Sequence, residues 1–225
     1  MNASTLSFQE QLHQFSLFQG FSNPEMMQLT GNTRFDFLKV DAGKTVVKEG
    51  DVCNSLYFLV KGTVSVDTYP DDRSYRTNEE LGAPWLIQPE VIFGLSLRYT
   101  FTVKALDECR FILLSKDDVL RLFDDILTFR LNMLNLLASL GQQRQHKLWR
   151  RAPQTLRDRI IRFITDHCVY PAGPKKLYML MQQLALEVND SRLDVSKALN
   201  EMQRQGLVEL HRGCINIPML EYLFR

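Results

Sequence analysis

The segment Ser191-Arg-Leu-Asp-Val-Ser-Lys-Ala-Leu-Asn-Glu-Met-Gln-Arg204 decides the fold of the C-terminal third of the chain. Its apolar residues recur at helical spacing, and Asp194 follows Ser191 at the spacing of an N-terminal cap. One side of the predicted helix carries Val195, Ala198, Leu199 and Met202. The other side carries Arg192, Leu193, Ser196, Lys197 and Asn200. A short helix with one apolar and one basic, amide-bearing side suits docking in the major groove of DNA.

The residues around this segment predict a winged helix-turn-helix. A short helix should precede it, with Leu184, Ala185 and Val188 on its inner side. Asn189-Asp190 can form the tight turn between the two helices, because asparagine tolerates the left-handed backbone conformation. After Gly206, alternating residues around Arg212-Gly213 predict a β-hairpin, the wing.

A long helix is predicted over residues 126–151, where Ala152-Pro153 breaks it. Its first apolar stripe is the predicted dimerisation seam: Ile126, Phe129, Met133, Leu136 and Leu140. A neighbouring face carries Leu127, Leu131, Leu134 and Leu148. Two stripes need two partners, which we take to be the chain's own N-terminal domain and the same helix of a second copy. Alternatively, the two stripes form one wide face that packs on the core of the same chain.

The N-terminal half predicts short β-strands. Runs rich in β-branched and aromatic residues, such as 44–48, 56–60 and 63–67, alternate with Gly43, Gly50 and Gly62. Many short strands at turn-like spacing predict a sandwich or barrel. We therefore expect a β-domain with N-terminal helices over 1–125, a dimerisation helix over 126–151 and a winged helix-turn-helix over 152–225.

Composition narrows the class of protein. No apolar run is long enough to span a bilayer, and the N-terminus lacks the pattern of a secretion signal, so we expect a cytoplasmic protein. The four cysteines form no CxxC pair, which predicts reduced thiols rather than disulfides or a metal site. Residues 142–225 hold 14 basic and 8 acidic side chains, which favours a polyanionic partner. No nucleophile–base motif, metal pair or phosphate-binding glycine loop is present, so no enzyme is expected.

Together these motifs resemble the CRP/FNR family of transcription regulators over nearly the whole chain. The likeness rests on Gly43-Lys-Thr-Val-Val-Lys-Glu-Gly-Asp51, Leu56-Tyr-Phe-Leu-Val-Lys-Gly62, Thr102-Val-Lys-Ala-Leu-Asp-Glu-Cys109 and the helix-turn-helix residues. It implies an α+β fold: an antiparallel jelly-roll β-barrel like that of cyclic-nucleotide-binding domains, a dimerisation helix and a winged helix-turn-helix. It also implies a homodimer on a double-stranded DNA operator, a small-molecule effector and contact with RNA polymerase.

The effector region departs from the family pattern. Phe93-Gly94 is followed by Leu95 where nucleotide-binding members carry glutamate, and Tyr99 stands near their phosphate-binding arginine, with Arg98 one place off. Losing such partners costs orders of magnitude in affinity, so cyclic AMP is not the expected effector. The N-terminal cysteine cluster of iron–sulfur members is missing, and haem stays open, with His146 as the foremost ligand candidate. The expected effector-binding residues are Phe93, Gly94, Leu95, Ser96, Arg98, Tyr99 and Thr100.

The resemblance also assigns DNA contacts. Arg192 and Lys197 match the positions that reach guanine edges, and Leu193 replaces a cytosine-reading glutamate, so it would touch a thymine methyl group. Phosphate contacts are expected from Ser191, Gln182, Gln183 and Arg212. The altered effector region and Leu193 leave one alternative: a ligand-sensing or protein-interaction module of the same fold that has lost DNA binding.

Overall fold

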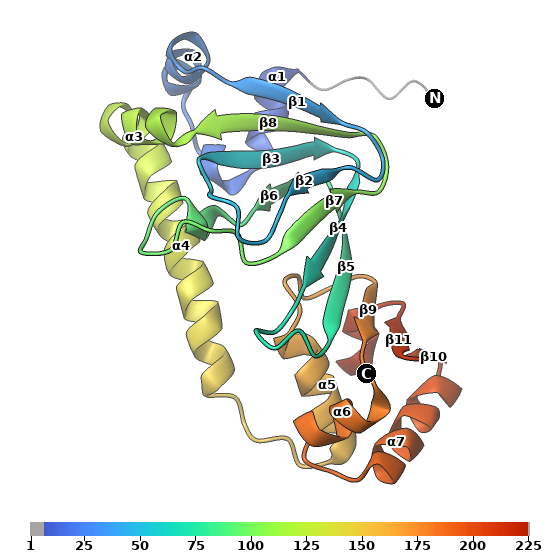
Figure 1. Cartoon of the computed structure of the whole chain (residues 1–225). Helices are drawn as coiled ribbons and strands as arrows, with labels where there is room; N and C mark the ends of the chain where they lie inside the picture. Colours follow the sequence, from blue (N-terminus) through green and yellow to red (C-terminus); the bar gives the residue numbers. More distant parts are fainter. Residues whose placement is uncertain (1–6, 225) are drawn as a thin grey trace. The chain divides into compact units, whose positions relative to one another are not determined.

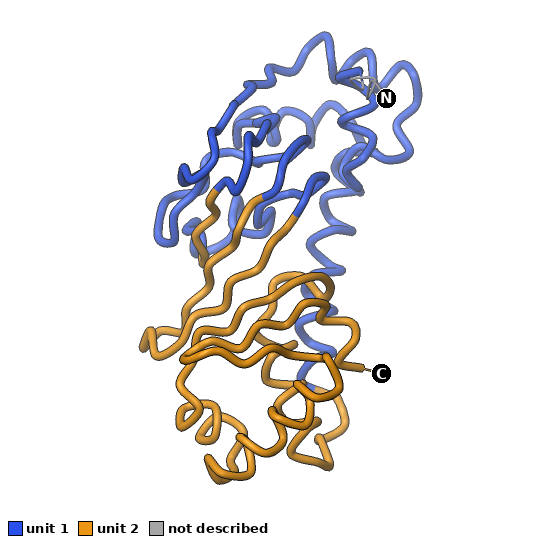
Figure 2. The backbone as a smooth tube through the Cα atoms, turned by 90° about the vertical axis from the view of Figure 1, so that its right-hand side faces the viewer, with its two compact units in different colours: residues 1–63, 82–99, 105–148 blue, residues 64–81, 100–104, 149–225 orange. Residues whose placement is uncertain are grey.

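The computed structural model describes residues 7–224 and divides the chain into two compact units (Figure 2). Unit 1 takes in the chain up to residue 63 together with residues 82–99 and 105–148. Unit 2 consists of residues 64–81, 100–104 and 149–225. This division differs from the predicted one in two respects: the long helix packs with unit 1, and residues 64–81 and 100–104 pack with the C-terminal segment. The three predicted domains stay a prediction.

Unit 1 is built on a four-stranded antiparallel sheet in the order β1-β8-β3-β6 (Figure 1). The strands of unit 1 are β1 (Asp36–Val40), β2 (Thr45–Val47), β3 (Ser55–Lys61), β6 (Trp85–Ile87) and β8 (Cys109–Ser115). On one face of β3 and β8, Leu56 and Phe58 pair with Leu114 and Ile112, and all four are fully buried. On the other face Leu59 pairs with Phe111, and both are at most 1% exposed, so the centre of the sheet is covered on both faces.

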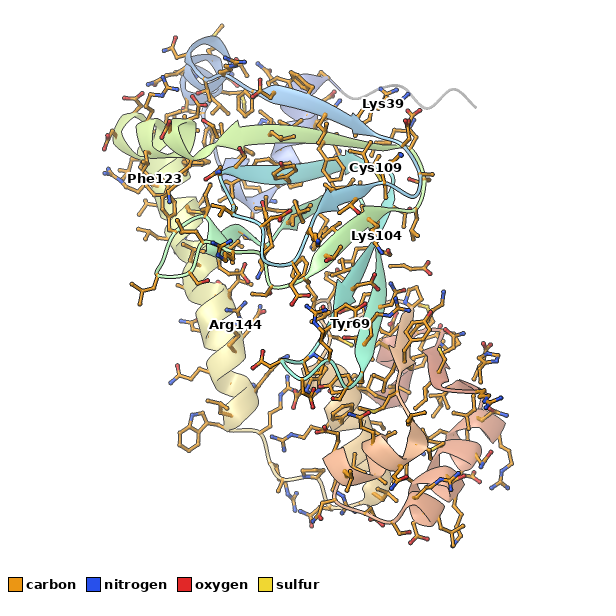
Figure 3. The ribbon with its side chains drawn as sticks, viewed as in Figure 1. Lys39, Tyr69, Lys104, Cys109, Phe123 and Arg144 are labelled. Carbon is orange, nitrogen blue, oxygen red and sulfur yellow. The ribbon has the colours of Figure 1, made fainter. Side chains whose placement is uncertain are left out.

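Helices surround this sheet. They are α1 (Phe8–His13), η1 (Ser16–Phe18), α2 (Asn23–Asn32), η2 (Pro89–Val91), α3 (Lys116–Asp125) and α4 (Leu127–Leu148). The side chain of Ser115 caps α3 by accepting a hydrogen bond from the backbone N–H of Asp118. Arg144, on the later turns of α4 (Figure 3), forms an ion pair with Glu90 at 2.5 Å.

The inner side of α4 belongs to the core of unit 1. Ile126, Phe129 and Met133 are at most 1% exposed, and the Phe129 ring lies 5.8 Å from the rings of both Phe18 and Phe123. The Asn132 side chain donates hydrogen bonds to two carbonyl oxygens near η1, at 3.1 and 2.8 Å. The prediction that Ile126, Phe129 and Met133 face a second copy is therefore wrong, because all three are buried within unit 1.

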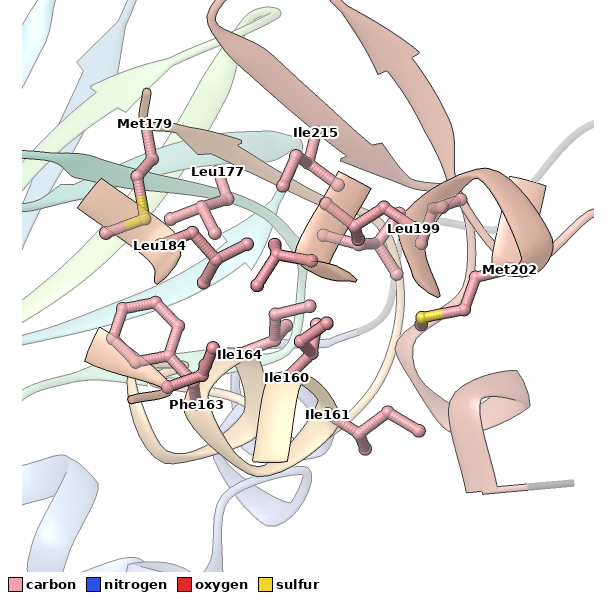
Figure 4. Packing of buried hydrophobic residues seen from close by; sticks show 14 of the residues in the cluster. Ile160, Ile161, Phe163, Ile164, Leu177, Met179, Leu184, Leu199, Met202 and Ile215 are labelled. Atoms are coloured by element: carbon pink, nitrogen blue, oxygen red, sulfur yellow. The ribbon is translucent and has the colours of Figure 1, made fainter. Parts of the chain in front are cut away.

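Unit 2 combines an antiparallel sheet with a helical core. Its strands run in the order β10-β11-β9-β5-β4-β7. They are β4 (Thr63–Thr68), β5 (Arg76–Gly82), β7 (Thr102–Ala105), β9 (Lys175–Tyr178), β10 (Glu209–His211) and β11 (Cys214–Ile217). The helices are α5 (Leu156–Asp166), α6 (Met181–Glu187), α7 (Arg192–Arg204) and η3 (Leu220–Phe224). Figure 4 shows their apolar side chains meeting in one cluster, among them Ile164, Leu184 and Leu199.

The predicted α+β class with antiparallel strands is confirmed. Among the described residues the strands form two antiparallel sheets, each of which runs between two edge strands. Within residues 7–224 all four cysteines are free: Cys53 and Cys109 are buried, and Cys168 and Cys214 are half-buried. Burial raises the pKa of the Cys53 and Cys109 thiols, which fits inert core thiols.

Candidate nucleic-acid interface

The helix-turn-helix of unit 2 is formed by α6, a tight turn and α7. Asn189 adopts the left-handed conformation, with φ 51°, as its residue type predicts. The backbone N–H of Asp190 donates to the carbonyl of Ala185 at 2.9 Å, and the Asp190 carboxylate pairs with Arg159 of α5. The turn is thus tied both to the helix before it and to the core helix beneath it.

The two sides of α7 have opposite character. Val195, Leu199 and Met202 are at most 1% exposed and enter the core cluster. Arg192, Leu193, Lys197 and Asn200 are exposed, and Ser196 is half-buried beside them. Arginine, lysine, serine and asparagine side chains supply the hydrogen-bond donors and acceptors that read base edges. The predicted polarity of this helix is confirmed.

The first turn of α7 is organised by Ser191 and Asp194. The Ser191 hydroxyl accepts from the Asp194 backbone N–H at 3.0 Å and donates to the Asp194 carboxylate at 2.8 Å. Lys197 Nζ lies 3.0 Å from the same carboxylate. These hydrogen bonds, that of Ser191 first, hold the pKa of Asp194 below its usual value. The ion pair is exposed and therefore weak, so a phosphate or a guanine edge can compete for Lys197.

The wing follows α7. Strands β10 and β11 pair antiparallel, with Leu210 opposite Ile215, and the turn between them holds Arg212 and Gly213. Gly213 has φ 72°, the left-handed region in which a side chain would be strained. β11 also pairs with β9, and the backbone N–H of Met179 donates to the Gly213 carbonyl at 3.1 Å. Arg212 is exposed at the tip of this hairpin.

The predicted contact residues all lie on the helix-turn-helix or the wing. Besides those on α7, Ser191 is exposed as its N-cap, Gln182 is exposed on α6, and Gln183 is half-buried. Leu180 precedes α6 without a side-chain cap, as its residue type predicts. The structure thus places the nine predicted DNA-contact residues in unit 2; their roles stay predictions.

Unit 1 contains a separate small cavity of about 180 Å³. It is lined by Val46, Val47, Asp51, Val52, Asn54, Ser55, Tyr57 and Tyr99. Burial raises the pKa of both tyrosine hydroxyls, and the Tyr99 hydroxyl donates to the Ser55 carbonyl at 3.5 Å. Of the seven predicted effector residues only Tyr99 reaches this cavity; sequence patterns gave no signal for the others that line it.

Comparison with known proteins identifies the fold. Residues 37–125 match the family model of the cyclic nucleotide-binding domain. The catabolite activator protein of Thermus thermophilus is 19% identical, with 93% of this chain and 97% of that chain aligned and a TM-score of 0.54. The chain has the fold of this protein. The fold that the family resemblance implied is thereby confirmed.

Two further structures match part of the chain. The sensor domain of the transcriptional regulator DNR from Pseudomonas aeruginosa is 20% identical over 65% of this chain and 95% of that one, with a TM-score of 0.51. The N-terminal domain of a transcriptional regulator from Streptomyces coelicolor A3(2) is also 20% identical, over 64% of this chain and 99% of that one, with a TM-score of 0.50. No curated protein sequence matches.

The cyclic nucleotide-binding domain of this chain does not fit a cyclic nucleotide. Among the described residues, no lysine or arginine lines the cavity, whose one charged residue is Asp51. The Arg98 guanidinium instead donates to the Gly50 carbonyl at 2.6 Å, and Leu95 is fully exposed. A phosphate placed here would lack a positive partner and face a carboxylate.

The remaining effector and cofactor predictions lie outside the cavity. The Phe93 ring lies 5.7 Å from that of Phe123 and 5.2 Å from Lys116 Nζ. Gly94, Ser96 and Thr100 are exposed, as is His146 on α4. Within residues 7–224 no cluster of three metal-ligating side chains occurs. None of the described helices combines the length and the apolar character that crossing a bilayer requires.

Proposed function

We propose that the protein is a sequence-specific DNA-binding transcription regulator. This proposal rests on the two sides of α7. One side is apolar and buried, and the other carries the exposed Arg192, Leu193, Lys197 and Asn200 with the half-buried Ser196 beside them. The helix is preceded by the tight turn at Asn189 and followed by a wing with exposed Arg212. A recognition helix inserts into the major groove, and the residues beside it fix the register on the phosphates.

The structural relatives support the same role. One is described as a catabolite activator protein and another as the sensor domain of a transcriptional regulator. We expect the chain to work in the cytoplasm, where it can reach DNA and contact RNA polymerase. Unit 1 would receive the signal, and the cavity at Tyr57 and Tyr99 favours a small ligand without a phosphate group. The signal would shift the protein between states that bind the operator with different affinity.

We further propose that the protein acts as a homodimer through the outer face of α4. There Leu127, Leu131, Leu134 and Leu148 are between 49% and 79% exposed. With Ala138, Gly141 and the polar Gln145 between them they follow the alternating four- and three-residue spacing of a coiled-coil seam. This face replaces the buried stripe expected from the sequence. Leu136 and Leu140, which are half-buried, lie outside it.

A protein-interaction module without DNA binding is the second candidate. It is favoured by three leucines exposed on or beside the helix-turn-helix: Leu180, Leu186 and Leu193, at 68%, 76% and 65%. The two functions differ in their response to salt. DNA affinity falls steeply as salt rises, because bound phosphates release counterions. An apolar protein contact has no such dependence.

Arg192→Ala tests the proposed recognition helix. We expect specific binding to weaken by about 1–3 kcal/mol and base choice to relax at one position per half-site, because a guanine partner is lost. Binding sites are first selected from random duplexes with the wild-type protein, and both proteins are then titrated against each single-base variant. Arg204→Ala, which removes an exposed arginine paired with Glu201 at the far end of α7, serves as the control. Unchanged selectivity in Arg192→Ala would remove this residue from the interface.

A further inference from the structure

The segment between residues 64 and 81 packs with the winged helix-turn-helix. Its second strand, β5, pairs antiparallel with β9, from Arg76 opposite Tyr178 to Glu79 opposite Lys175. These pairs join positions about a hundred residues apart in the chain. The β4–β5 hairpin is therefore part of unit 2.

A buried ion pair links β5 to β9. Lys175 Nζ lies 2.9 Å from the Glu79 carboxylate, and the two side chains are 1% and 0% exposed. The same carboxylate accepts the backbone N–H groups of Val169 and Tyr170 at 2.5 and 3.0 Å. Lys175 also donates to the carbonyl of Ala172 at 2.7 Å. Glu79 thus holds both the start of β9 and the loop after α5.

Aromatic and hydroxyl contacts extend this attachment. The Tyr75 ring, 8% exposed, lies edge-on to Phe163 of α5 at 5.5 Å within the core cluster. The Arg76 guanidinium lies 4.0 Å from the centre of the Tyr178 ring. The Thr77 hydroxyl donates to the His167 carbonyl at 3.4 Å. The hairpin therefore contacts the rest of the unit at three successive residues, Tyr75 directly before β5 and Arg76 and Thr77 within it.

The contacts between β5 and β9 also bear on the wing. β9 lies between β5 and β11, so the strand that Glu79 fixes is also the strand on which the wing is built. Leu177 of β9 pairs with Ile215 of β11, and the N–H of Met179 holds the turn at Gly213. Arg212 stands at that turn. A displacement of β9 would therefore displace the Arg212 guanidinium.

We propose that the β4–β5 hairpin is an arm of the DNA-binding unit and that Glu79 is a positioning residue, which sets β9 and the wing through Lys175. This inference rests on the proposed function. Removing the carboxylate leaves a buried ammonium group without its counter-charge, a strongly unfavourable state. β9 then shifts to bring Lys175 to water, and the wing loses its fixed place on the DNA backbone.

The test compares Glu79→Gln with Glu80→Gln in the full-length protein. Glu80 is the neighbouring residue, partly exposed, and pairs with Lys176 at 3.2 Å, so its variant controls for loss of a charge on the same strand. Hydrogen exchange without DNA reports on the amides of Val169, Tyr170, Leu177 and Ile215. Fluorescence anisotropy on a selected duplex reports affinity at several salt concentrations.

We expect Glu79→Gln to exchange at least tenfold faster at these amides and to bind DNA at least tenfold more weakly. The slope of log K against log salt should become shallower by about one phosphate contact, that of Arg212. Glu80→Gln should stay within about twofold of wild type, as expected for an exposed pair. If Glu79 only stabilised the fold, Glu79→Gln would lower the fraction of molecules that bind DNA and leave the slope of log K against log salt unchanged. That result would overturn the inference.

The double variant Glu79→Gln, Lys175→Met keeps the test decisive where the single variant folds poorly. It removes the buried charge altogether, so amide protection and the salt slope should return toward wild type. A double variant as impaired as Glu79→Gln would show that Lys175 is not the link. If the amides of Glu79→Gln exchanged at the wild-type rate, the inference would be rejected, and the proposed function in DNA binding would still stand. A wild-type protein without DNA affinity would instead reject the proposed function.

Discussion

The double variant Leu131→Glu, Leu134→Glu is expected to be a monomer and to bind its operator more than a hundredfold more weakly. Both leucines are half-exposed on the outer face of α4, where a second copy of the helix would cover them. Across a twofold axis the introduced carboxylates would face each other and be desolvated together. A monomer engages one half-site only and loses the gain from linking two binding events, about 10²–10⁴-fold.

Sedimentation equilibrium gives the mass, and anisotropy on full and half operators gives the affinities. Leu120→Glu is the matched control, because Leu120 is 45% exposed on α3, outside the proposed seam. It should leave both mass and affinity unchanged. A double variant that still sediments as a dimer would show that the outer face of α4 is not the interface.

Phe129→Ala should lower the free energy of unfolding by about 3–5 kcal/mol, the usual cost of removing a large buried ring. Phe129 is fully buried and contacts the aromatic rings of Phe18 and Phe123. Urea unfolding can be followed through Trp85 of unit 1 in a Trp149→Phe background. Arg130→Ala, at the next, exposed position of α4, is the control and should change stability by less than about 0.5 kcal/mol.

The two variants separate the two faces of α4. The structure predicts that the Phe129 variant loses stability, whereas the Leu131 and Leu134 variant keeps a folded unit 1 and loses its partner. If Phe129→Ala kept its stability but became monomeric, the result would support the dimerisation seam first expected from the sequence.

Local patterns predicted much of the fold. Helical spacing, the Ser191–Asp194 cap and the tolerance of Asn189 for the left-handed conformation determine α7 and the turn before it, and short-range interactions decide all three. The partner of each stripe on α4 is not a local property. Ile126 and Leu127 are equally apolar, and only the packing of unit 1 buries one and leaves the other exposed.

Long-range contacts explain what the sequence could not predict. Glu79 and Lys175 lie in segments whose alternation fits any strand, and nothing in either segment identifies the other as its partner. The cavity residues around Asp51 and Tyr57 likewise come together only through folding. The replacement of the expected glutamate by Leu95 is visible in the sequence itself, and the expectation drawn from it, an effector other than cyclic AMP, stays a prediction.

The central claim is that α7 and the wing bind duplex DNA, and a salt titration of the wild-type protein tests it most directly. Affinity for a selected duplex is measured by anisotropy between 50 and 200 mM salt, two concentrations across which a protein that contacts six to ten phosphates loses about 10³–10⁵-fold in affinity. We predict a linear, steeply negative dependence of log K on log salt, together with preference for the selected duplex over a scrambled one. Binding that is absent, or that stays constant as salt rises, would contradict the account.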